Sequence, residues 1–267
     1  SKTVSSEDFH VSLEESGDLL VRFTQGDDRH EWSLQSRSVY TEKATRIAYS
    51  GDTPEVVGAS LHMYAGRSAS GTARAVLHED GRISGTFVTE GGLMRVTPAE
   101  LEDSQPHGGA EHLVEQLGLP SLFGNESVTE NTWSGQPWSP GCFSCDDVMH
   151  EFLLGVAIDV SAWELYGENA LAKIERAVSE ASVIFEHQMS VRLVIDSVVI
   201  HKTREQAPEW AGSCGSCNQT TGCLGGRWLG QKLNLVESSD DLPYEAHTHL
   251  FTGCGAGSDY VGMSWVG

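Results

Sequence analysis

Six cysteines are the residues whose type and spacing first suggest chemistry in this 267-residue sequence. They form two tight groups and one outlier, at Cys142 and Cys145, at Cys214, Cys217 and Cys223, and at Cys254. Two Cys-x2-Cys pairs could supply the halves of a zinc ribbon, whereas an even number of cysteines also permits disulfides. Disulfides within 214–254 are the favoured interpretation, because the signs described next indicate an oxidising compartment.

Those signs are two glycosylation sequons and the character of the N-terminus. Asn125-Glu-Ser127 and Asn218-Gln-Thr220 both lie in polar, turn-rich stretches, which makes Asn125 and Asn218 candidate glycan acceptors. The sequence begins at Ser1 without an apolar leader, as expected of a mature secreted protein whose signal peptide has been removed. We therefore expect a secreted or extracellular glycoprotein.

Signatures of catalysis are mostly missing from the sequence. There is no GxSxG, no phosphate-binding Gly-Lys loop and no GxGxxG. Glu follows His at positions 30, 78 and 150, but none of these pairs has the second His four residues on that a helical zinc site needs. His247 and His249 would share one face of an extended segment and could bind a metal, although a structural role is the favoured interpretation.

Charge and hydropathy exclude two classes of partner. The 38 acidic and 17 basic residues give a net charge of -21, and this field would repel phosphate backbones and anionic lipid surfaces. The longest apolar run, Phe152–Ile158, is far too short to cross a bilayer. We therefore expect neither nucleic-acid binding nor membrane insertion.

The first part of the chain is predicted to form a small antiparallel β module. Strand-like patterns cover 19–23, 60–64, 73–77 and 83–88, and Asp80-Gly81 marks a turn between the last two. The segment 103–147 holds four of the eight prolines, which favours a linker. This predicts a β-rich module over 1–102, a junction over 103–147 and a second domain over 148–267.

A strand, a helix and a second strand are predicted in the second domain. Continuous apolar runs at 152–158 and 191–200 are typical of strands buried on both faces, and they flank a helical pattern. The apolar stripe of the helix consists of Leu171, Ile174, Val178, Ala181, Phe185 and Met189, whereas Lys173, Glu175, Arg176, Glu180 and Glu186 are predicted to face water. This spacing predicts a βαβ unit with parallel strands. Residues 203–232 are predicted to be a Cys/Gly-rich loop, and Val261–Val266 a last short strand.

Two C-terminal motifs, in their order after this βαβ pattern, resemble the adamalysin (reprolysin) metzincin protease family. They are His249-Leu-Phe-Thr-Gly253 and Val261-Gly-Met-Ser-Trp-Val-Gly267. The prodomain of the same family is similar to Val57-Gly-Ala-Ser-Leu-His-Met63, Gly81-Arg-Ile-Ser-Gly-Thr-Phe-Val-Thr-Glu-Gly-Gly92, Arg95-Val-Thr-Pro98 and Glu111-His-Leu-Val114. The resemblance implies an α+β and α/β fold, with a β-rich prodomain followed by the βαβ-containing upper part of a metzincin-like protease domain.

The resemblance also implies a function, which is zymogen-like zinc metalloendopeptidase activity. Substrate would pair with the backbone of an edge strand at Gly262, Met263, Ser264 and Trp265. The HExxHxxGxxH helix of the family should follow this strand and is absent, so no catalytic residue and no metal ligand is assigned. Zinc is expected in the complete family enzyme and not from this chain alone, which we predict to be inactive.

Two further expectations complete the sequence-based hypothesis. Cys142 or Cys145 could act as a cysteine switch near the domain junction, although a structural disulfide is the favoured interpretation. The expected partner is a polypeptide substrate or a second chain that carries the zinc-binding half. The alternative to a protease is a non-catalytic extracellular binding or structural module that keeps the first half of the protease fold.

Overall fold

The computed structural model describes residues 2–4, 9–25, 28–68, 71–89, 92–98, 112–117, 148–212, 227–240, 242 and 247–254. The chain forms two compact units that are interleaved along the sequence. The first unit takes residues 1–39, 61–151 and 176–193, and the second takes 40–60, 152–175 and 194–267. Each unit therefore contains residues from both sides of 103–147, and the division of the chain into successive domains stays a prediction.

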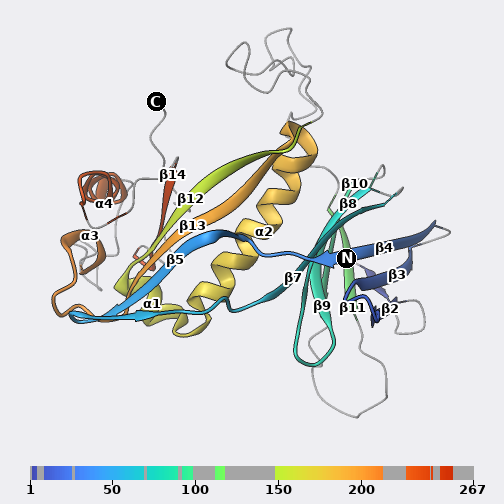
Figure 1. Cartoon of the computed structure of the whole chain (residues 1–267), viewed down its shortest axis with the longest axis horizontal. Coiled ribbons are helices and arrows are strands. Elements are labelled where there is room, and N and C mark those ends of the chain that lie inside the picture. Colours follow the sequence, from blue (N-terminus) through green and yellow to red (C-terminus); the bar gives the residue numbers. More distant parts are fainter. Residues whose placement is uncertain are drawn as a thin grey trace, which may run out of the picture. The chain divides into compact units, whose positions relative to one another are not determined.

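An antiparallel sheet of nine strands builds the first unit (Figure 1). Its order is β1-β11-β10-β9-β8-β7-β4-β3-β2, and every neighbouring pair is antiparallel. The strands are β1 (Lys2–Val4), β2 (Phe9–Leu13), β3 (Leu19–Gln25), β4 (Asp28–Ser36), β7 (His62–Ser68), β8 (Gly71–Leu77), β9 (Ile83–Thr89), β10 (Gly92–Pro98) and β11 (His112–Leu117). The antiparallel β structure predicted for this part of the chain is confirmed, including the turn at Gly81, whose φ of +80° suits glycine, whereas β5 and β6 from the predicted module belong to the other sheet and β11 from the predicted junction belongs to this one.

The nine-stranded sheet is curled around a core of aromatic side chains. Trp32, Phe23 and Phe87 are fully buried and pack with ring centroids 4.8 to 5.8 Å apart. Phe9 on edge strand β2 stacks on His112 of β11, near the opposite edge, with 4.1 Å between ring centroids. The two ends of the sheet therefore meet around one shared aromatic core.

A mixed sheet of five strands builds the second unit, in the order β14-β12-β13-β5-β6. The strands are β5 (Tyr40–Ser50), β6 (Thr53–Val56), β12 (His150–Ile158), β13 (Val191–His201) and β14 (His247–Phe251). Strand β14 is parallel to β12, and β5 is parallel to β13, whereas β6 returns antiparallel to β5. Leu154–Ile158 are all buried, so both faces are covered in the second half of β12 as the apolar run predicts, whereas Phe152 at the start of the run is exposed.

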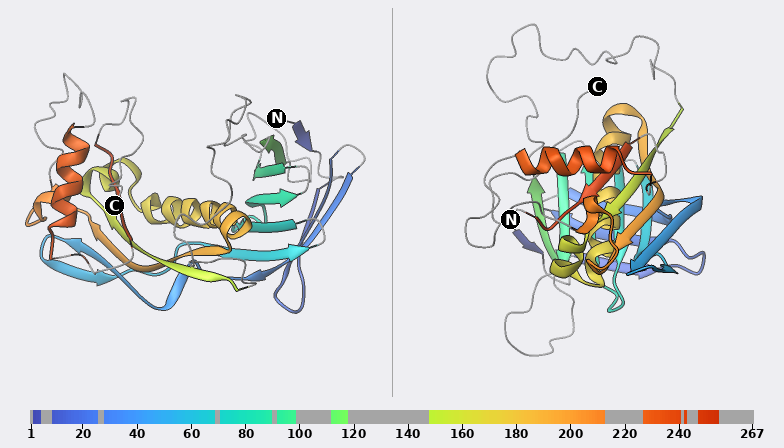
Figure 2. Two further views of the ribbon diagram at one scale, coloured as in Figure 1. Left: turned by 90° about the horizontal axis from the view of Figure 1, so that it is seen from above. Right: turned by 90° about the vertical axis from the view of Figure 1, so that its left-hand side faces the viewer.

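The helices are α1 (Val160–Tyr166), α2 (Asn169–Met189), α3 (Glu209–Gly212) and α4 (Arg227–Glu237). The predicted strand, helix and strand are present in this order along the chain as β12, α2 and β13 (Figure 2). Trp210 of α3 and Val236 of α4 pack with Ala157 and Val199 of the sheet. The predicted loop over 203–232 is therefore wrong where α3 and the first half of α4 lie. In the described parts of the chain, no helix is long and apolar enough to span a membrane.

Strand β5 contains a wide bulge where it pairs with β13. Tyr40 lies opposite Ile195, and the next paired residues are Thr45 and Ser197. Residues 41–44 therefore stand opposite the single residue Asp196, whose carboxylate accepts a hydrogen bond from the Thr41 hydroxyl. The bulge displaces four residues while the pairing resumes for five more, so β5 remains part of the sheet.

Candidate functional site

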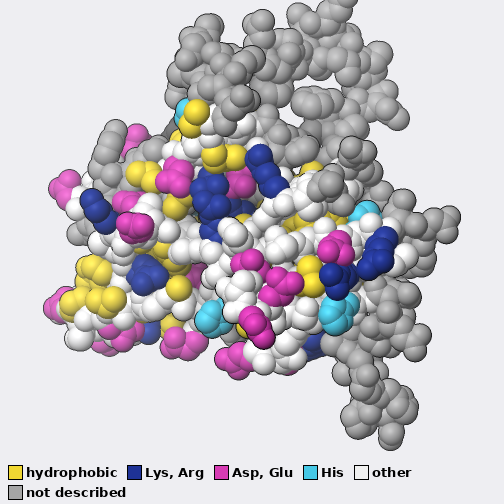
Figure 3. Space-filling view, turned by 45° about the vertical axis from the view of Figure 1, so that its right-hand side comes forward, with side chains coloured by type: hydrophobic (Ala, Val, Ile, Leu, Met, Phe, Trp, Pro, Cys, Tyr) yellow, Lys and Arg dark blue, Asp and Glu magenta, His cyan; other side chains and the backbone are white. Residues whose placement is uncertain are grey.

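The described residues on the face drawn in Figure 3 do not by themselves mark a binding site. Figure 3 shows acidic and basic side chains interspersed over the visible face, with no extended area of a single sign. A strong field that would attract a charged macromolecule is therefore not evident on this face. The candidate site must be built from individual groups, and the C-terminal motifs give the starting point.

The motif His249-Leu-Phe-Thr-Gly253 lies at the carboxyl end of the parallel strands β12 and β14. Strand β14 runs parallel to β12, with Phe251 opposite Ile158. Both strands therefore end on the same side of the sheet, at its carboxyl end. In open sheets with parallel strands, ligands commonly bind at the carboxyl ends of the strands. The residues that follow each strand, Asp159 and Thr252, should therefore be close, and the structure brings them together.

Asp159 organises this edge through both of its carboxylate oxygens. Its Oδ1 caps helix α1 by accepting the Ala162 N–H at 2.8 Å, and it also accepts the Ser161 hydroxyl at 2.7 Å. Its Oδ2 forms an ion pair with Lys232 of α4. Both side chains of this pair are almost completely buried, at 0% and 4% exposure. The buried pair joins α1, α4 and the ends of two strands at one point.

Gly253 and Cys254 fix the direction in which the chain leaves β14. The Gly253 N–H donates to Ser161 Oγ at 2.9 Å, and a Cβ at position 253 would lie 2.4 Å from the Ser161 carbonyl oxygen. Only glycine fits there without displacing the backbone. Cys254 is buried and disulfide-bonded, with its Sγ 3.1 Å from Ser161 Oγ. The chain is therefore held firmly where it leaves β14.

We expect the disulfide of Cys254 to join it to another cysteine of the 214–254 region. The sulfur lies beside Lys232 and Ser161, so it is placed within a buried polar cluster and not on the surface. Peptide mapping under non-reducing conditions should find Cys254 linked to Cys214, Cys217 or Cys223. Recovery of all four as free thiols would contradict the expectation, and zinc bound at Cys142, Cys145, Cys214 and Cys217 would support the ribbon instead.

His247 and His249 lie on β14 as the two-residue spacing predicts. Their ring centroids are 5.9 Å apart, and the His249 ring stacks on Phe251 with 4.6 Å between centroids. Partial desolvation of the His249 ring, together with the charge that His247 can carry, lowers the pKa of His249, although the side chain as a whole is exposed. Among the described residues, no three His, Cys, Asp or Glu side chains are grouped to hold a metal ion.

The lowered pKa of His249 gives a prediction about pH. Because the unfolded chain takes up a proton at a higher pH than the folded chain does, stability should fall as the pH drops below about 6.5. Urea unfolding at pH 7.5 and pH 5.5 should show less loss of stability in His249→Gln than in the unmodified chain. An identical loss in both proteins would show that His249 does not titrate differently on folding.

A second polar feature, on helix α2, differs from the sequence prediction. Glu175 and Glu186, which were expected to face water, are buried at 1% and 7% exposure. With Ser179 and Ser182, also buried, they follow the helical spacing 4-3-4 and so form one continuous row along α2. We call these four residues the α2 polar row. Conversely, Phe185 and Met189 of the expected apolar stripe are exposed at 37% and 36%.

The N-terminal end of the α2 polar row binds the segment around β5. Glu175 Oε1 accepts the Tyr40 hydroxyl at 2.6 Å, and both Glu175 oxygens accept the Ser60 N–H at 3.0 and 3.1 Å. Burial, together with the charge of Glu175, raises the pKa of Tyr40, so its hydroxyl keeps the proton that it donates. The Arg46 guanidinium lies over the Tyr40 ring, 4.7 Å from its centroid.

The C-terminal end of the α2 polar row binds two arginines. Glu186 forms ion pairs with Arg74 of β8 and Arg192 of β13, and it accepts the Ser182 hydroxyl at 3.3 Å. Burial alone would raise the pKa of Glu186, but the two guanidinium groups outweigh it and the pKa is lowered. The Ser182 hydroxyl also accepts the Leu193 N–H at 3.0 Å. The Glu186 carboxylate is therefore charged, and it binds both arginines and the Ser182 hydroxyl.

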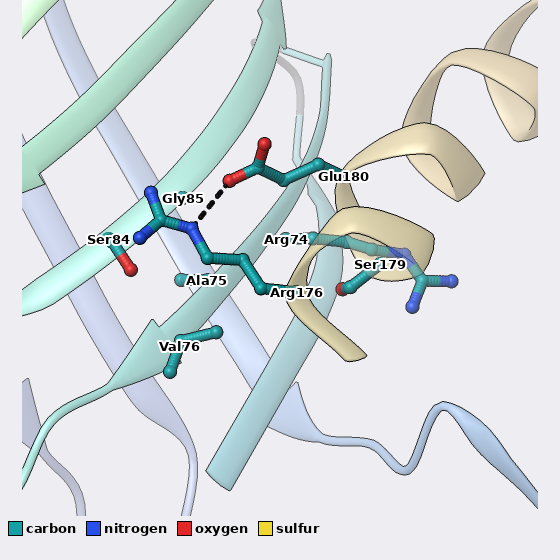
Figure 4. Close-up of a pocket in the computed structure, with 8 residues that line it drawn as sticks. All are labelled: Arg74, Ala75, Val76, Ser84, Gly85, Arg176, Ser179 and Glu180. Carbon is teal, nitrogen blue, oxygen red and sulfur yellow. Dashed lines mark hydrogen bonds and ion pairs between the residues drawn. The ribbon is translucent and has the colours of Figure 1, made fainter. Parts of the chain in front are cut away.

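A small cavity lies beside the middle of the α2 polar row (Figure 4). It is lined by Arg74 and Ser84 from the strands and by Arg176, Ser179 and Glu180 from the helix, and its volume is about 10 Å³. That volume holds about one water molecule and no organic ligand. In the close-up, the Arg74 and Arg176 side chains point away from each other, and Arg176 pairs with Glu180 on the helix surface. The cavity is therefore a packing feature and not a substrate site.

Most of the residues singled out by the sequence lie outside the described residues. These are the substrate-binding candidates Gly262, Met263, Ser264 and Trp265, the glycan acceptors Asn125 and Asn218, and Cys142, Cys145, Cys214, Cys217 and Cys223. Their roles stay predictions. The sequence analysis assigned no role to Asp159, Lys232 or Arg74. The signal that could have revealed the α2 polar row is its 4-3-4 spacing of Glu, Ser, Ser and Glu.

Comparison of the sequence with known proteins assigns no family to the chain, so the site is interpreted from its own geometry. No protein-family model matches the chain, and no curated protein matches it significantly in sequence.

Proposed function

We propose that this chain supplies the prodomain and the upper, substrate-lining part of a secreted, zymogen-like zinc metalloendopeptidase of the adamalysin type. One observation supports the proposal above the others. The strand that carries His249-Leu-Phe-Thr-Gly253 is β14, which lies parallel to β12, is the outermost described strand of its sheet and follows the expected β12, α2 and β13. The motif thus occupies the position from which an extended segment can continue along the sheet edge.

The reaction of such an enzyme divides between this chain and residues beyond it. In such an enzyme a bound zinc ion would act as a Lewis acid and would activate the water that attacks the peptide carbonyl. The side chains grouped in the described ranges do not fit zinc, so we derive no zinc-dependent step from them. The contribution of this chain would be to bind substrate through the backbone of Gly262, Met263, Ser264 and Trp265, by addition of a strand.

The experiment that tests this proposal is peptide mapping of the natural protein. Material purified from its source should contain a peptide with the HExxHxxGxxH pattern, either in the same polypeptide or in one that remains bound through purification. Intact mass then tells which of the two holds. Natural material without any such peptide would overturn the proposal and favour the non-catalytic extracellular module.

The 267-residue chain by itself should show no peptidase activity, since no zinc-binding helix is present in its sequence. A fluorogenic peptide incubated with homogeneous protein and added zinc should be cleaved no faster than in buffer. Cleavage that copurifies with the chain and is abolished by a chelator would contradict this expectation.

A further inference from the structure

Two histidines hold the first two residues of β9 in the nine-stranded sheet. His112 of β11 accepts the Ile83 N–H through its ring Nε2 at 3.2 Å, and His78 Nε2 lies 2.9 Å from Ser84 Oγ. His112, Ile83 and Ser84 are buried, at 2%, 0% and 0% exposure. All four residues belong to the first unit, so the two contacts are internal to that unit.

The bond between Ile83 and His112 lies where the backbone pairing of β9 with β10 ends. The last pair of these strands is Gly85 with Val96, and Ile83 lies two residues before Gly85. The acceptor for the Ile83 N–H is instead the side chain of His112, from the strand on the far side of β10. A buried backbone N–H needs an acceptor, because leaving it unpaired costs free energy. His112 therefore completes the hydrogen bonding at this end of β9.

The Ile83 bond can form only with the neutral ring of His112. A backbone N–H can only donate, so Nε2 must offer its lone pair and the ring proton must lie on Nδ1. A protonated imidazolium carries N–H groups at both positions and cannot accept. The contact of His78 differs, because the Ser84 hydroxyl can either donate or accept. Protonation therefore breaks the contact of His112 and leaves that of His78 possible.

The surroundings of His112 make a charge on its ring unfavourable. The ring stacks on Phe9 with 4.1 Å between centroids, and Phe9, Ile83, Val96 and Val114 belong to one buried apolar cluster. A stacked aromatic ring stabilises a cation by less than burial of that cation costs. The titratable residues of β11 and of the strands around His112 are Lys2, opposite Val114, Arg95 and Glu115, opposite each other, and the exposed His10.

The segment just before Ile83 also carries charges. Arg82 forms an ion pair with Asp80 at the surface. Burial lowers the pKa of His78, Asp80 opposes this shift, and Arg176 and Arg82 reinforce it. His78 therefore also favours unfolding in acid, and a test of His112 needs a measurement at Ile83 itself.

We propose that the bond between His112 and Ile83 is a pH-sensitive contact, which closes the sheet between β11 and β9 at neutral pH and opens there as the pH falls below about 6.5. The open form takes up a proton that the bonded ring excludes, so acid favours opening. The apolar contacts of Val96 and Val114 do not titrate, and they keep the opening local. The inference does not depend on the proposed proteolytic function.

Amide hydrogen exchange of the full chain, measured by NMR at pH 7.5 and pH 5.0, tests the proposal. The protection factor of Ile83, which corrects for the intrinsic pH dependence of exchange, should fall by about 30-fold, as linkage to one histidine of ordinary pKa predicts. The protection factor of Phe87, opposite Met94 within the β9 and β10 pairing, should change by less than about 3-fold. A constant value for Ile83, or an equal fall for Phe87, would overturn the proposal.

His112→Gln separates the charge of the ring from its role as acceptor. Glutamine Oε1 can accept the Ile83 N–H at either pH, so the fall in Ile83 protection should shrink to less than about 3-fold. The matched control is His10→Gln on β2, whose exposed ring should leave the fall at about 30-fold. A fall in His112→Gln as steep as in the unmodified chain would assign the effect to another group and overturn the proposal.

The unmodified chain offers a second measurement in case His112→Gln does not fold. Nitrogen NMR distinguishes the two neutral tautomers of a histidine ring, and at pH 7.5 His112 should carry its proton on Nδ1. A ring that carries the proton on Nε2 cannot accept the Ile83 N–H. That result would overturn the proposal without any substitution.

Discussion

Replacing Glu186 by alanine in the intact chain is expected to lower the free energy of unfolding by about 3–5 kcal/mol. The substitution leaves the Arg74 guanidinium, whose side chain is 3% exposed, without its counter-charge. Arg192 at 17% exposure loses the same partner, although it keeps a contact with Glu151. Desolvating a cation without a partner costs more than the ion pair contributed, which is why the expected loss is large.

The control for this prediction is Glu180→Ala, on the same helix one and a half turns earlier. Its pair with Arg176 has side-chain exposures of 24% and 35%, so water replaces the lost contact and the loss should be at most about 1 kcal/mol. Urea denaturation followed by circular dichroism measures both variants. A Glu186→Ala protein as stable as Glu180→Ala would show that the buried pair is not formed as described.

Asp159→Asn is the second substitution with a large expected effect. Asparagine can still cap α1 by accepting the Ala162 N–H, but it no longer neutralises Lys232, which is 4% exposed. We expect a loss of about 3–5 kcal/mol, since the buried ammonium loses the carboxylate that neutralises it. Thermal and urea unfolding measure the change.

Comparison with Asp159→Ala separates the effect of the lost charge from the effect of the lost helix cap, and Glu164→Ala serves as the control. Asp159→Ala should cost about 1 kcal/mol more than Asp159→Asn because the cap is lost as well. Glu164→Ala is the control on the same helix, where the pair with Arg204 is exposed at 52% and 64% and should contribute little. If Asp159→Asn were as mild as Glu164→Ala, the Lys232 charge would have to be neutralised by another group.

Local sequence patterns predicted the elements whose burial is simple. The runs at 152–158 and 191–200 are largely apolar, and β12 begins two residues before the first run while β13 ends one residue after the second. The helix between them was placed by its 3.6-residue period, which predicts its C-terminal residue Met189. Apolar burial leaves a periodic trace in the sequence, and these elements have it.

Elements that bury charge left no such trace. Lys232 lies inside the protein against Asp159, so a basic residue interrupts the apolar side of α4, and the Gly and Cys residues nearby favoured a loop. The same reason applies to Glu175 and Glu186, because a charged residue on a helix ordinarily faces water. Their burial depends on Tyr40, Ser60 and Arg74, and local periodicity carries no information about those distant partners.

The predicted substrate-binding residues differ from the buried charges, because they lie beyond the described part of the chain. The resemblance places substrate at Gly262, Met263, Ser264 and Trp265, and the structure describes the chain up to Cys254. What it adds is the anchor before that segment, where Gly253 packs against the Ser161 backbone. The motif His249-Leu-Phe-Thr-Gly253 contains this glycine, but the sequence does not reveal its contact with Ser161, because that contact forms only when the ends of two parallel strands meet.

The pairing of β5 with β13 has a consequence for the order in which the protein is made. About 150 residues separate the two strands, and at ribosomal rates of about 5–20 residues per second β5 waits on the order of 10 s for its partner. During that interval it is a nascent strand with open backbone groups, which invites pairing with the wrong chain. Glu42 and Lys43 in its bulge, with Pro54 in the adjoining β6, are the residue types that discourage such pairing. We therefore expect the charged bulge to discourage wrong pairing of the nascent strand until β13 is synthesised.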